Sequence, residues 1–478
     1  MTSASERKAL HVLTGAGSLC VLFTVVHLAR ALPNWSHLNY VSGVWLGLAA
    51  DVSHGIWFRP IIGEMGYGGA IYLPAYFAAV GALMRVGISA VAAGFTISIL
   101  SGVLLCAGVY GFLRRQEAGK LLSASAAFLS LGAVSVQHAL TTVRGDLLST
   151  AFTFAALSLY PRPYAMAVLF TLAFSAKITA VYGVLAVTAF FLINRRWRES
   201  AQLAGSTALG YGLVLLVSAY LSNGRIIEGL FSFGYDEFDF AGLLTSPVLL
   251  YRFIRQDVAL APLLVVAAAI MLASLRVSWR ELPSLLLVST LMITLVVFAM
   301  PGIDFNHLMD LHVATVAFLL VQLSVRRVDL RQGVAFLGLM AVLATAGMTW
   351  HFEPPSVPDV KSQMQRIERA IADSTAADRP LFSTHPLLPI MGGELPFLGD
   401  PFSFSSLKDA YPELVPDLHE RIETGYFGAI VLHWDIATSS GRSKADGWFG
   451  KGFTDAVYRR YEEVDEPSAY SVFVRRRR

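Results

Sequence analysis

Hydrophobicity divides the chain into two unequal parts, and the larger part is too apolar to fold in water. Residues 1–350 form a series of apolar stretches separated by short segments that carry arginine, whereas residues 351–478 have the mixed composition of a soluble domain. Only 15% of the 478 residues are charged, against about 25% in soluble domains. The sequence therefore predicts a polytopic α-helical membrane protein with a small water-exposed α/β domain at its C-terminal end.

The apolar part contains many segments of membrane-spanning character. A helix needs about 20 apolar residues to cross the roughly 30 Å hydrocarbon core of a bilayer, and about 11 transmembrane helices are expected on that basis. They lie at residues 10–31, 88–112, 121–140, 147–160, 164–176, 178–194, 201–221, 256–275, 282–300, 311–325 and 333–350. The fourth and fifth are too short for full crossings, so a helical hairpin is an alternative. In both cases Asp146 and Lys177 lie on the same side.

The basic residues of the short loops indicate the orientation, because such residues favour the cytoplasmic side. With the N-terminus inside, the inner loops carry Arg7, Lys8, Arg114, Arg115, Lys120, Arg162, Arg195, Arg196, Arg198, Arg276, Arg280, Arg326, Arg327 and Arg331. The predicted arrangement has a cytoplasmic N-terminus, a long first outer loop at residues 31–87 and an extracytoplasmic domain at residues 351–478. The net charge of +3 is too small to indicate a nucleic-acid partner.

Charged and polar residues recur where the outer loops meet the helices. They are Asp51, Glu64, Arg144, Asp146, Lys177, Asp304, His307 and Asp310. Burying one such group in lipid costs a few kcal/mol. Each one taken alone is equally well explained as a helix cap or as a side chain that reaches to water. Acidic and basic groups gathered at one membrane depth favour a shared, enclosed polar site.

The order of short motifs along the chain resembles a known superfamily. The motifs are Ala50–Gly55 (ADVSHG), Gly69–Tyr76 (GAIYLPAY), Val143–Asp146 (VRGD), Ala176–Thr179 (AKIT) and Gly302–Leu308 (GIDFNHL). In this order they resemble the GT-C superfamily of membrane glycosyltransferases that use polyprenyl-phosphate sugars, in the branch of the aminoarabinose transferases and protein O-mannosyltransferases. The resemblance implies a GT-C-like fold in a bacterial inner (plasma) membrane.

The resemblance also implies an activity. The expected enzyme is an inverting hexosyl- or pentosyl-type glycosyltransferase that moves a sugar from a polyprenyl-phosphate donor to an acceptor hydroxyl on the extracytoplasmic side. The acceptor would be a glycan, a lipid or a protein, and the remaining partners would be membrane lipids. A phosphate ester is a good leaving group, so the residues must activate the acceptor and hold the phosphate charge.

The residue types suggest a role for each member of the site. Asp51 is the expected general base. Arg144 and Lys177 are expected to bind the donor phosphate, with Arg59 as a further phosphate ligand. The other expected substrate-binding residues are Glu64, Tyr72, His138, Asp146, Asn306 and His307.

No cofactor is expected to be required. A divalent metal is compatible with the Asp, Glu and His residues near the outer face, but the sequence has no spacing typical of a dedicated metal site. The C-terminal domain has two alternative roles: to bind the acceptor or cover the active site, or to stabilise the assembly.

Two other functions compete with the transferase. A lipid-linked glycan polymerase or ligase would share the donor and the outer site, with a different loop arrangement. A transporter or flippase of a lipid-linked substrate would show paired halves and broken helices at the midplane, whereas here the charges gather near one face. The long first loop carrying Asp51 favours the transferase.

Overall fold

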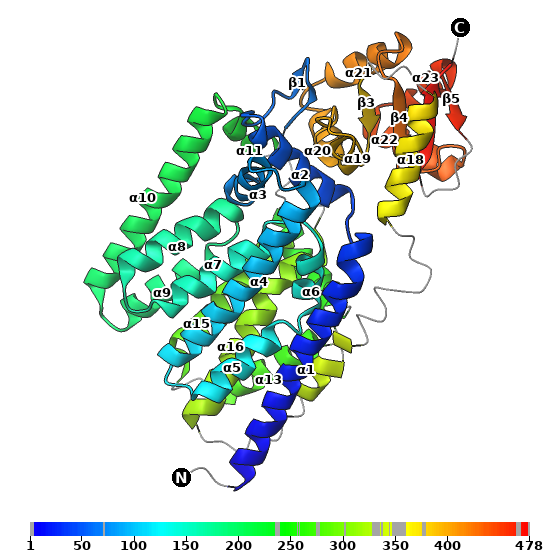
Figure 1. The fold of residues 1–478 in the computed structure, drawn as a ribbon. Coiled ribbons are helices and arrows are strands. Elements are labelled where there is room, and N and C mark those ends of the chain that lie inside the picture. Colours follow the sequence, from blue (N-terminus) through cyan, green and yellow to red (C-terminus); the bar gives the residue numbers. More distant parts are fainter. Residues whose placement is uncertain are drawn as a thin grey trace.

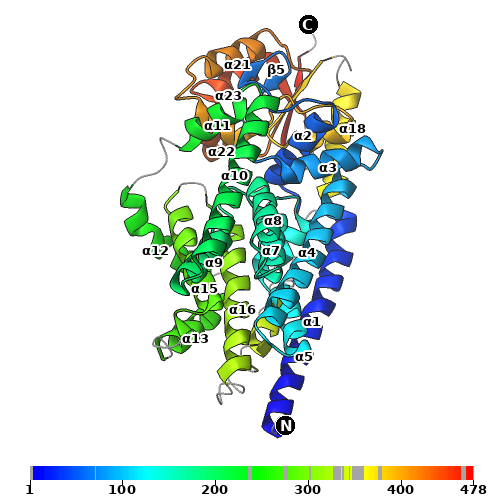
Figure 2. The ribbon, with the colours of Figure 1, turned by 90° about the vertical axis from the view of Figure 1, so that its left-hand side faces the viewer.

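The computed structural model has a bundle of helices with a smaller, sheet-containing unit over one end of it (Figure 1). It describes residues 4–69, 72–234, 240–255, 257, 259–273, 278–300, 303–326, 335, 338–343, 345–346, 360–374, 379–464 and 470–476. In the view of Figure 2 the N-terminus lies at the opposite end of the bundle from the smaller unit.

The bundle consists of helices from the predicted membrane part. They are α1 (Ala4–Asn34), α4 (Ala90–Arg115), α5 (Lys120–Ser130), α6 (Val134–Thr141), α7 (Asp146–Ser158), α8 (Pro163–Ala176), α9 (Tyr182–Ile193), α10 (Trp197–Leu221), α11 (Arg225–Gly234), α12 (Phe240–Ile254), α13 (Leu260–Ala273), α15 (Leu282–Val297), the 3-10 helix η1 (Phe305–Leu308) and α16 (Met309–Arg326). An apolar core is buried between them, together with polar side chains of the same helices, while large apolar side chains remain exposed on the outside, as in a helix bundle surrounded by lipid.

The predicted apolar helical architecture is confirmed, and the predicted number of spans stays a prediction. Four described helices are long and apolar enough to cross a membrane: Lys8–Asn34, Ala90–Arg115, Trp197–Leu221 and Phe305–Ser324. The bent pair Lys120–Ser130 and Val134–Thr141, with an angle of 66°, makes a fifth if it is counted as one span. The predicted short spans at 147–160 and 164–176 form the contacting helices α7 and α8. Half of the predicted span 333–350 lies outside the described residues.

The first outer loop folds into short elements of its own. These are α2 (Tyr40–Ser53), the two-stranded hairpin β1 (Ile62–Gly63) and β2 (Gly66–Tyr67), and α3 (Ala75–Arg85). Helix α2 begins at Asn39, whose side chain accepts a hydrogen bond from the backbone N–H of Ser42 at 3.1 Å. This cap satisfies a helix-end donor and fixes where α2 starts.

The C-terminal unit is built around a four-stranded sheet. Its elements are α18 (Val360–Ser374), β3 (Leu381–Ser383), α19 (Leu387–Met391), α20 (Pro401–Leu407), α21 (Leu414–Glu423), β4 (Ala429–Leu432), α22 (Ser439–Phe449), α23 (Phe453–Arg460), β5 (Tyr461–Val464) and β6 (Ser471–Arg475). The strand order is β3-β4-β6-β5; β3 and β4 are parallel, and the other two pairings are antiparallel. All four residues of the central strand β4 are buried.

Backbone hydrogen bonds join the first outer loop to the C-terminal unit. Tyr67 donates from its N–H to the Phe397 carbonyl at 2.8 Å, and its own carbonyl accepts from the Gly399 N–H at 2.9 Å. Gly66 adopts a positive φ of 101°, and a Cβ there would lie 1.9 Å from the Phe397 carbonyl oxygen, so only glycine fits. On α2, a Cβ added to Gly43 would lie 2.7 Å from the backbone N of Leu387. The smaller unit is therefore fixed against the loop residues that surround the site.

Candidate active site

A buried ion pair lies where α7 begins and α8 ends. The Nζ of Lys177 is 2.6 Å from the Oδ1 of Asp146, and their side chains are 13% and 10% exposed. Asn306 of η1 donates from its Nδ2 to the same carboxylate oxygen at 2.9 Å. Three segments far apart in the sequence are thus joined at one end of the bundle.

Arg144 lies two residues before Asp146 and has hydrogen-bonding capacity to spare. Its Nη1 is 3.5 Å from the Oδ2 of Asp304, and its side chain is only 7% exposed. Its Nε is buried and makes no hydrogen bond with any residue that the structure describes. The Oδ1 of Asn306 is also buried and accepts no hydrogen bond from any residue that the structure describes. Buried polar atoms of a folded protein normally have partners, so these two atoms mark a place where a ligand is expected.

Asp310 fixes the inner side of this cluster. Its Oδ1 accepts from the hydroxyls of Thr150 at 2.6 Å and Tyr182 at 2.7 Å. These bonds tie the start of α16 to α7 and α9. The sequence analysis did not single out Thr150 or Tyr182; the signal for Thr150 was its position one helical turn after Asp146.

Aromatic side chains from the first loop border the cluster. The ring of Tyr72 lies 4.4 Å from the ring of Trp45. The hydroxyls of Tyr72 and Tyr40 both interact electrostatically with Arg144. Tyr72 is therefore at the site, as the sequence predicts, and Tyr40 is a site residue that the prediction missed.

Asp400 brings the C-terminal unit to the site. It interacts electrostatically with both Tyr40 and Tyr72. Its carboxylate caps α20, accepting from the N–H of Phe402 at 3.0 Å and the hydroxyl of Ser403 at 2.7 Å. Burial raises the pKa of the Asp400 carboxyl, and the bonds from Ser403 and Phe402 act in the opposite direction. Sequence reasoning missed Asp400 because nothing in its motif ties it to a loop so distant in the chain.

The two predicted histidines also lie at this end of the bundle. His138 packs edge-on against Phe305 with ring centres 4.8 Å apart, and it interacts electrostatically with Arg144 and Asp146. His307 interacts electrostatically with Asp146 and with Lys177. The structure thus brings together Tyr72, His138, Arg144, Asp146, Lys177, Asn306 and His307.

Asp51 and Arg59 are placed differently from what the sequence suggested. Arg59 donates from its Nε to the Oδ2 of Asp51 at 2.7 Å and from its Nη2 to the Oδ1. Asp51 lies on α2 eleven residues after Tyr40, which borders the cluster. Eleven helical residues span about 16 Å, so Asp51 and Tyr40 are far apart on this helix. Burial raises the pKa of the Asp51 carboxyl, and the Arg59 guanidinium acts in the opposite direction. This pair is not in contact with Arg144 or Lys177 among the hydrogen bonds and ion pairs of the described residues.

Most N–H donors of Arg59 already have a hydrogen-bond partner. Besides Asp51, its Nη1 donates to the carbonyl of Met65 at 2.8 Å and to the carbonyl of Pro396 at 2.5 Å. The guanidinium therefore joins the first loop to the C-terminal unit and uses four of its five N–H donors to do so. Its expected role as a phosphate ligand stays a prediction, and its hydrogen bonds give it a structural role as well.

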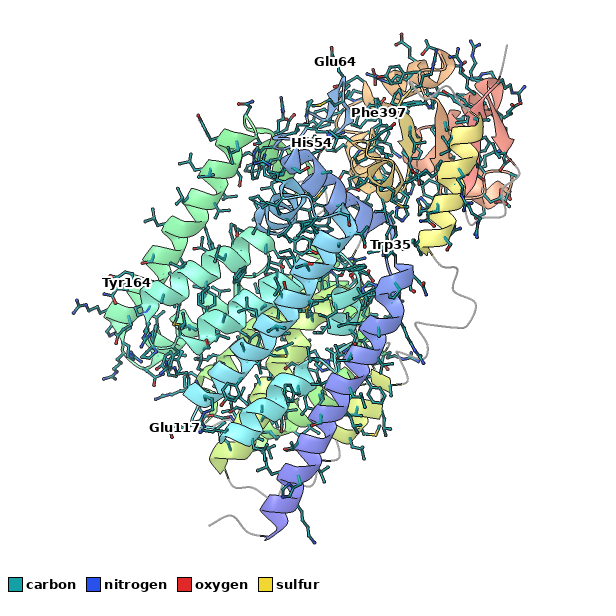
Figure 3. All side chains as sticks on the ribbon, viewed as in Figure 1. Trp35, His54, Glu64, Glu117, Tyr164 and Phe397 are labelled. Atoms are coloured by element: carbon teal, nitrogen blue, oxygen red, sulfur yellow. The ribbon has the colours of Figure 1, made fainter. Side chains whose placement is uncertain are left out.

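Glu64 does not reach the site either. It is exposed in the turn between β1 and β2. Figure 3 shows it projecting from the tip of the hairpin at the outer edge of the molecule, at the same end as Phe397. The hairpin turns outward because its backbone pairs with Phe397 and Gly399 on the other side.

The structure offers no obvious metal centre within the residues it describes. No group of three or more His, Cys, Asp or Glu side chains there is close enough together to hold a metal ion. The requirement for a metal stays a prediction that a chelator experiment must test.

No protein-family profile and no curated protein sequence matches the chain. Its three-dimensional structure, in contrast, matches solved structures over nearly its whole length. The crystal structure of ArnT from Cupriavidus metallidurans bound to undecaprenyl phosphate has a TM-score of 0.61 and 12% sequence identity, covering 95% of this chain and 97% of that one. The chain has the GT-C fold.

Two further structures share the GT-C fold with it. The apo state of the same ArnT has a TM-score of 0.55 and 14% identity, covering 94% of this chain and 97% of that one. The archaeal oligosaccharyltransferase AglB from Archaeoglobus fulgidus, in complex with an inhibitory peptide and a dolichol-phosphate, has a TM-score of 0.51 and 12% identity, covering 98% and 74%. The GT-C fold predicted from the order of the motifs is therefore confirmed.

Proposed function

We propose that this protein is a membrane glycosyltransferase that moves a sugar from a polyprenyl-phosphate donor to an acceptor hydroxyl. The observation that carries the proposal is the buried guanidinium of Arg144, whose Nε has no partner among the described residues. An anionic ligand with several acceptor oxygens suits such a group, because guanidinium binds phosphate through paired hydrogen bonds. Support comes from the fold, since the ArnT structure holds undecaprenyl phosphate and the AglB structure a dolichol-phosphate.

Arg144 and Lys177 have different roles in this proposal. Lys177 is already neutralised by Asp146 at 2.6 Å, so it acts mainly by holding the Asp146 carboxylate and, through it, Asn306. Arg144 has only the 3.5 Å contact with Asp304, and its charge is available to a ligand. In a site shielded from water, that charge stabilises negative charge on the departing phosphate more strongly than it would in solution.

The proposed reaction is a single displacement. The acceptor oxygen forms a bond to the anomeric carbon, the bond from that carbon to the phosphate oxygen breaks, and the polyprenyl phosphate leaves with the electron pair. The acceptor proton passes to a carboxylate. One displacement inverts the anomeric configuration, so a product that retains the configuration of the donor would contradict this scheme.

Asp304 is the carboxylate we propose as the general base. Its side chain is 47% exposed, next to Arg144, and only its Oδ1 is used as a helix cap, for the N–H of Phe305 at 2.8 Å. The Oδ2 has only the 3.5 Å contact with the Nη1 of Arg144, so it can still accept a hydrogen bond from an acceptor hydroxyl. Asp51 stays the base predicted from the sequence, but to act as one it would have to leave both donors of Arg59.

The two carboxylates can be compared directly. Asp304→Asn is expected to lower kcat by about 10²–10⁴-fold, because an amide cannot accept the acceptor proton. Asp51→Asn is expected to lower the thermal stability more than it lowers kcat, because it leaves the Arg59 charge buried and unpaired. The measurement is kcat and the melting temperature of both variants. A fully active Asp304→Asn beside a folded but inactive Asp51→Asn would return the base role to Asp51.

We propose further that the site faces the extracytoplasmic side of a bacterial plasma membrane. Basic side chains lie at the other end of the bundle: Arg115 donates from its Nε to the Ser158 carbonyl at 3.1 Å, and Arg196 donates from its Nη1 to the Tyr160 hydroxyl at 2.7 Å. Ser158 ends α7, whereas Asp146 begins it. Positive charge at that end favours a cytoplasmic position for it.

The activity is tested with isolated membranes and a panel of radiolabelled polyprenyl-phosphate sugars, with and without a chelator. A lipid-dependent, covalently labelled product supports the transferase. Movement of the intact donor lipid across the membrane, with no covalent product from any donor, would instead identify a transporter. Loss of product on chelation would show a metal requirement.

A further inference from the structure

A cluster of partly exposed aromatic rings lies beside the site, where the C-terminal unit meets the start of α2. We call it the aromatic patch; it consists of Tyr40, Phe402, His433, Trp434 and Trp448, none of which is fully buried. The ring centres of His433 and Trp434 are 3.8 Å apart, those of Trp434 and Trp448 are 4.9 Å apart, and those of Phe402 and Trp448 are 6.4 Å apart. Tyr40 is stacked on His433 at 5.8 Å with the planes 6° apart.

The position of the patch follows from the sheet. His433 and Trp434 come directly after β4, which runs parallel to β3. Ligands of open α/β sheets bind beyond the carboxyl ends of their parallel strands. Here that edge faces α2, because an added Cβ at Gly43 would touch the backbone N of Leu387, just after β3.

Tyr40 makes the patch continuous with the transfer site. Its ring belongs to the patch, whereas its hydroxyl interacts electrostatically with Arg144, Asp304 and Asp400. A molecule lying on the patch therefore extends toward the proposed base and the proposed phosphate ligand. This is where an acceptor must lie in order to present a hydroxyl.

The chemistry of the patch suits a sugar ring better than a lipid chain. A pyranose has a face of C–H groups, which packs on flat aromatic rings, and a rim of hydroxyls, which needs polar partners. The patch offers broad rings with polar atoms at their edges. The Nδ1 of His433 is one such atom; it is buried and makes no hydrogen bond within the described part of the chain. A hydrocarbon chain would leave it unsatisfied.

We propose that the aromatic patch binds a pyranose ring of a saccharide acceptor, so that the acceptor of this enzyme is a glycan rather than a protein. This inference rests on the proposed transferase function, because it assigns the acceptor subsite of that reaction. Trp448 provides the stacking surface, with Trp434 packed edge-on against it at 71°; His433 hydrogen-bonds the hydroxyl rim, and Tyr40 directs the ring toward Asp304.

The test is a binding titration of the full-length protein in detergent, followed by tryptophan fluorescence, without any donor lipid. The probes are four trisaccharides (maltotriose, cellotriose, chitotriose and mannotriose) and, for comparison, an unstructured Ser/Thr-containing peptide. At least one trisaccharide is expected to give a saturable signal. Trp448→Ala is expected to raise its Kd about tenfold or more, as for a central aromatic contact in an interface. Trp448→Phe, which keeps a flat ring, is expected to restore most of the affinity.

Trp197→Ala is the matched control, because Trp197 is 63% exposed and begins α10 at the opposite end of the bundle; its Kd is expected to equal that of the wild type. The inference would be overturned by the absence of a saturable saccharide signal, by an equal Kd in Trp448→Ala, or by saturable binding of the peptide alone. Because no donor is present, saccharide binding that depends on Trp448 would survive even if the transfer assay found no activity. The two proposals can therefore fail separately.

Discussion

Arg144→Gln is expected to lower kcat by about 10²–10³-fold and to raise KM for the lipid donor, because it removes a fixed cation from a developing phosphate charge. Glutamine removes the charge and keeps an amide donor on a shorter side chain, so the loss reports on the charge and the reach of Arg144 together. The side chain of Arg144 is only 7% exposed, and its surroundings screen the charge less than water would. Steady-state kinetics with varied donor concentration measure both effects.

Two variants show whether the effect is specific to Arg144. Arg144→Lys keeps the charge but loses the paired donors, and it is expected to recover only part of the activity. Arg162→Gln removes an exposed arginine just before α8, at the end of the bundle away from Asp146, and its kinetics are expected to match the wild type. A donor KM and kcat in Arg144→Gln equal to those of Arg162→Gln would rule out Arg144 as the phosphate ligand.

Arg59→Met is expected to lower the free energy of unfolding by about 3–5 kcal/mol, because removing one partner of a buried ion pair leaves the other charge uncompensated. The same change removes the bonds to the carbonyls of Met65 and Pro396. The C-terminal unit should therefore become sensitive to protease at lower denaturant concentrations. Thermal unfolding in detergent and limited proteolysis measure the two effects.

The double variant Asp51→Leu/Arg59→Met tests whether the loss of stability comes from the uncompensated charge. Replacing both charges with apolar side chains removes the uncompensated charge, so the double variant is expected to be more stable than Arg59→Met alone. Arg459→Met provides a surface control: the side chain of Arg459 is 60% exposed in its pair with Glu423, and such exposed pairs contribute little to stability. Equal melting temperatures for Arg59→Met and Arg459→Met would contradict a structural role for Arg59.

The sequence predicted the bundle well because its signals are local. Apolar stretches determine helices, and the positions of Asp146, Lys177 and Asn306 at helix ends on the same side follow from the number of crossings between them. The structure joins these three residues through hydrogen bonds and an ion pair. The number of membrane crossings tells on which side of the membrane residues lie, but it does not tell which atoms are in contact.

The prediction was weakest in the first outer loop. Asp51 and Arg59 are only eight positions apart, but their pairing depends on a carbonyl of Pro396, 337 positions beyond Arg59. A long loop can follow many paths, and here the path is chosen by contacts with the C-terminal unit. Tyr40 and Asp400 were missed for the same reason, because each reaches the site only once that unit is in place.

The hydrogen bonds between Tyr67 and the Phe397–Gly399 backbone have a consequence for how the protein could be shortened. The hairpin and the distal segment complete each other's main-chain bonding, as neighbouring strands do. A chain cut before residue 360 would lose the partner that shapes an early part of the polypeptide. The last quarter of the sequence should therefore be regarded as an internal support of the catalytic region, and it cannot be removed as an accessory module.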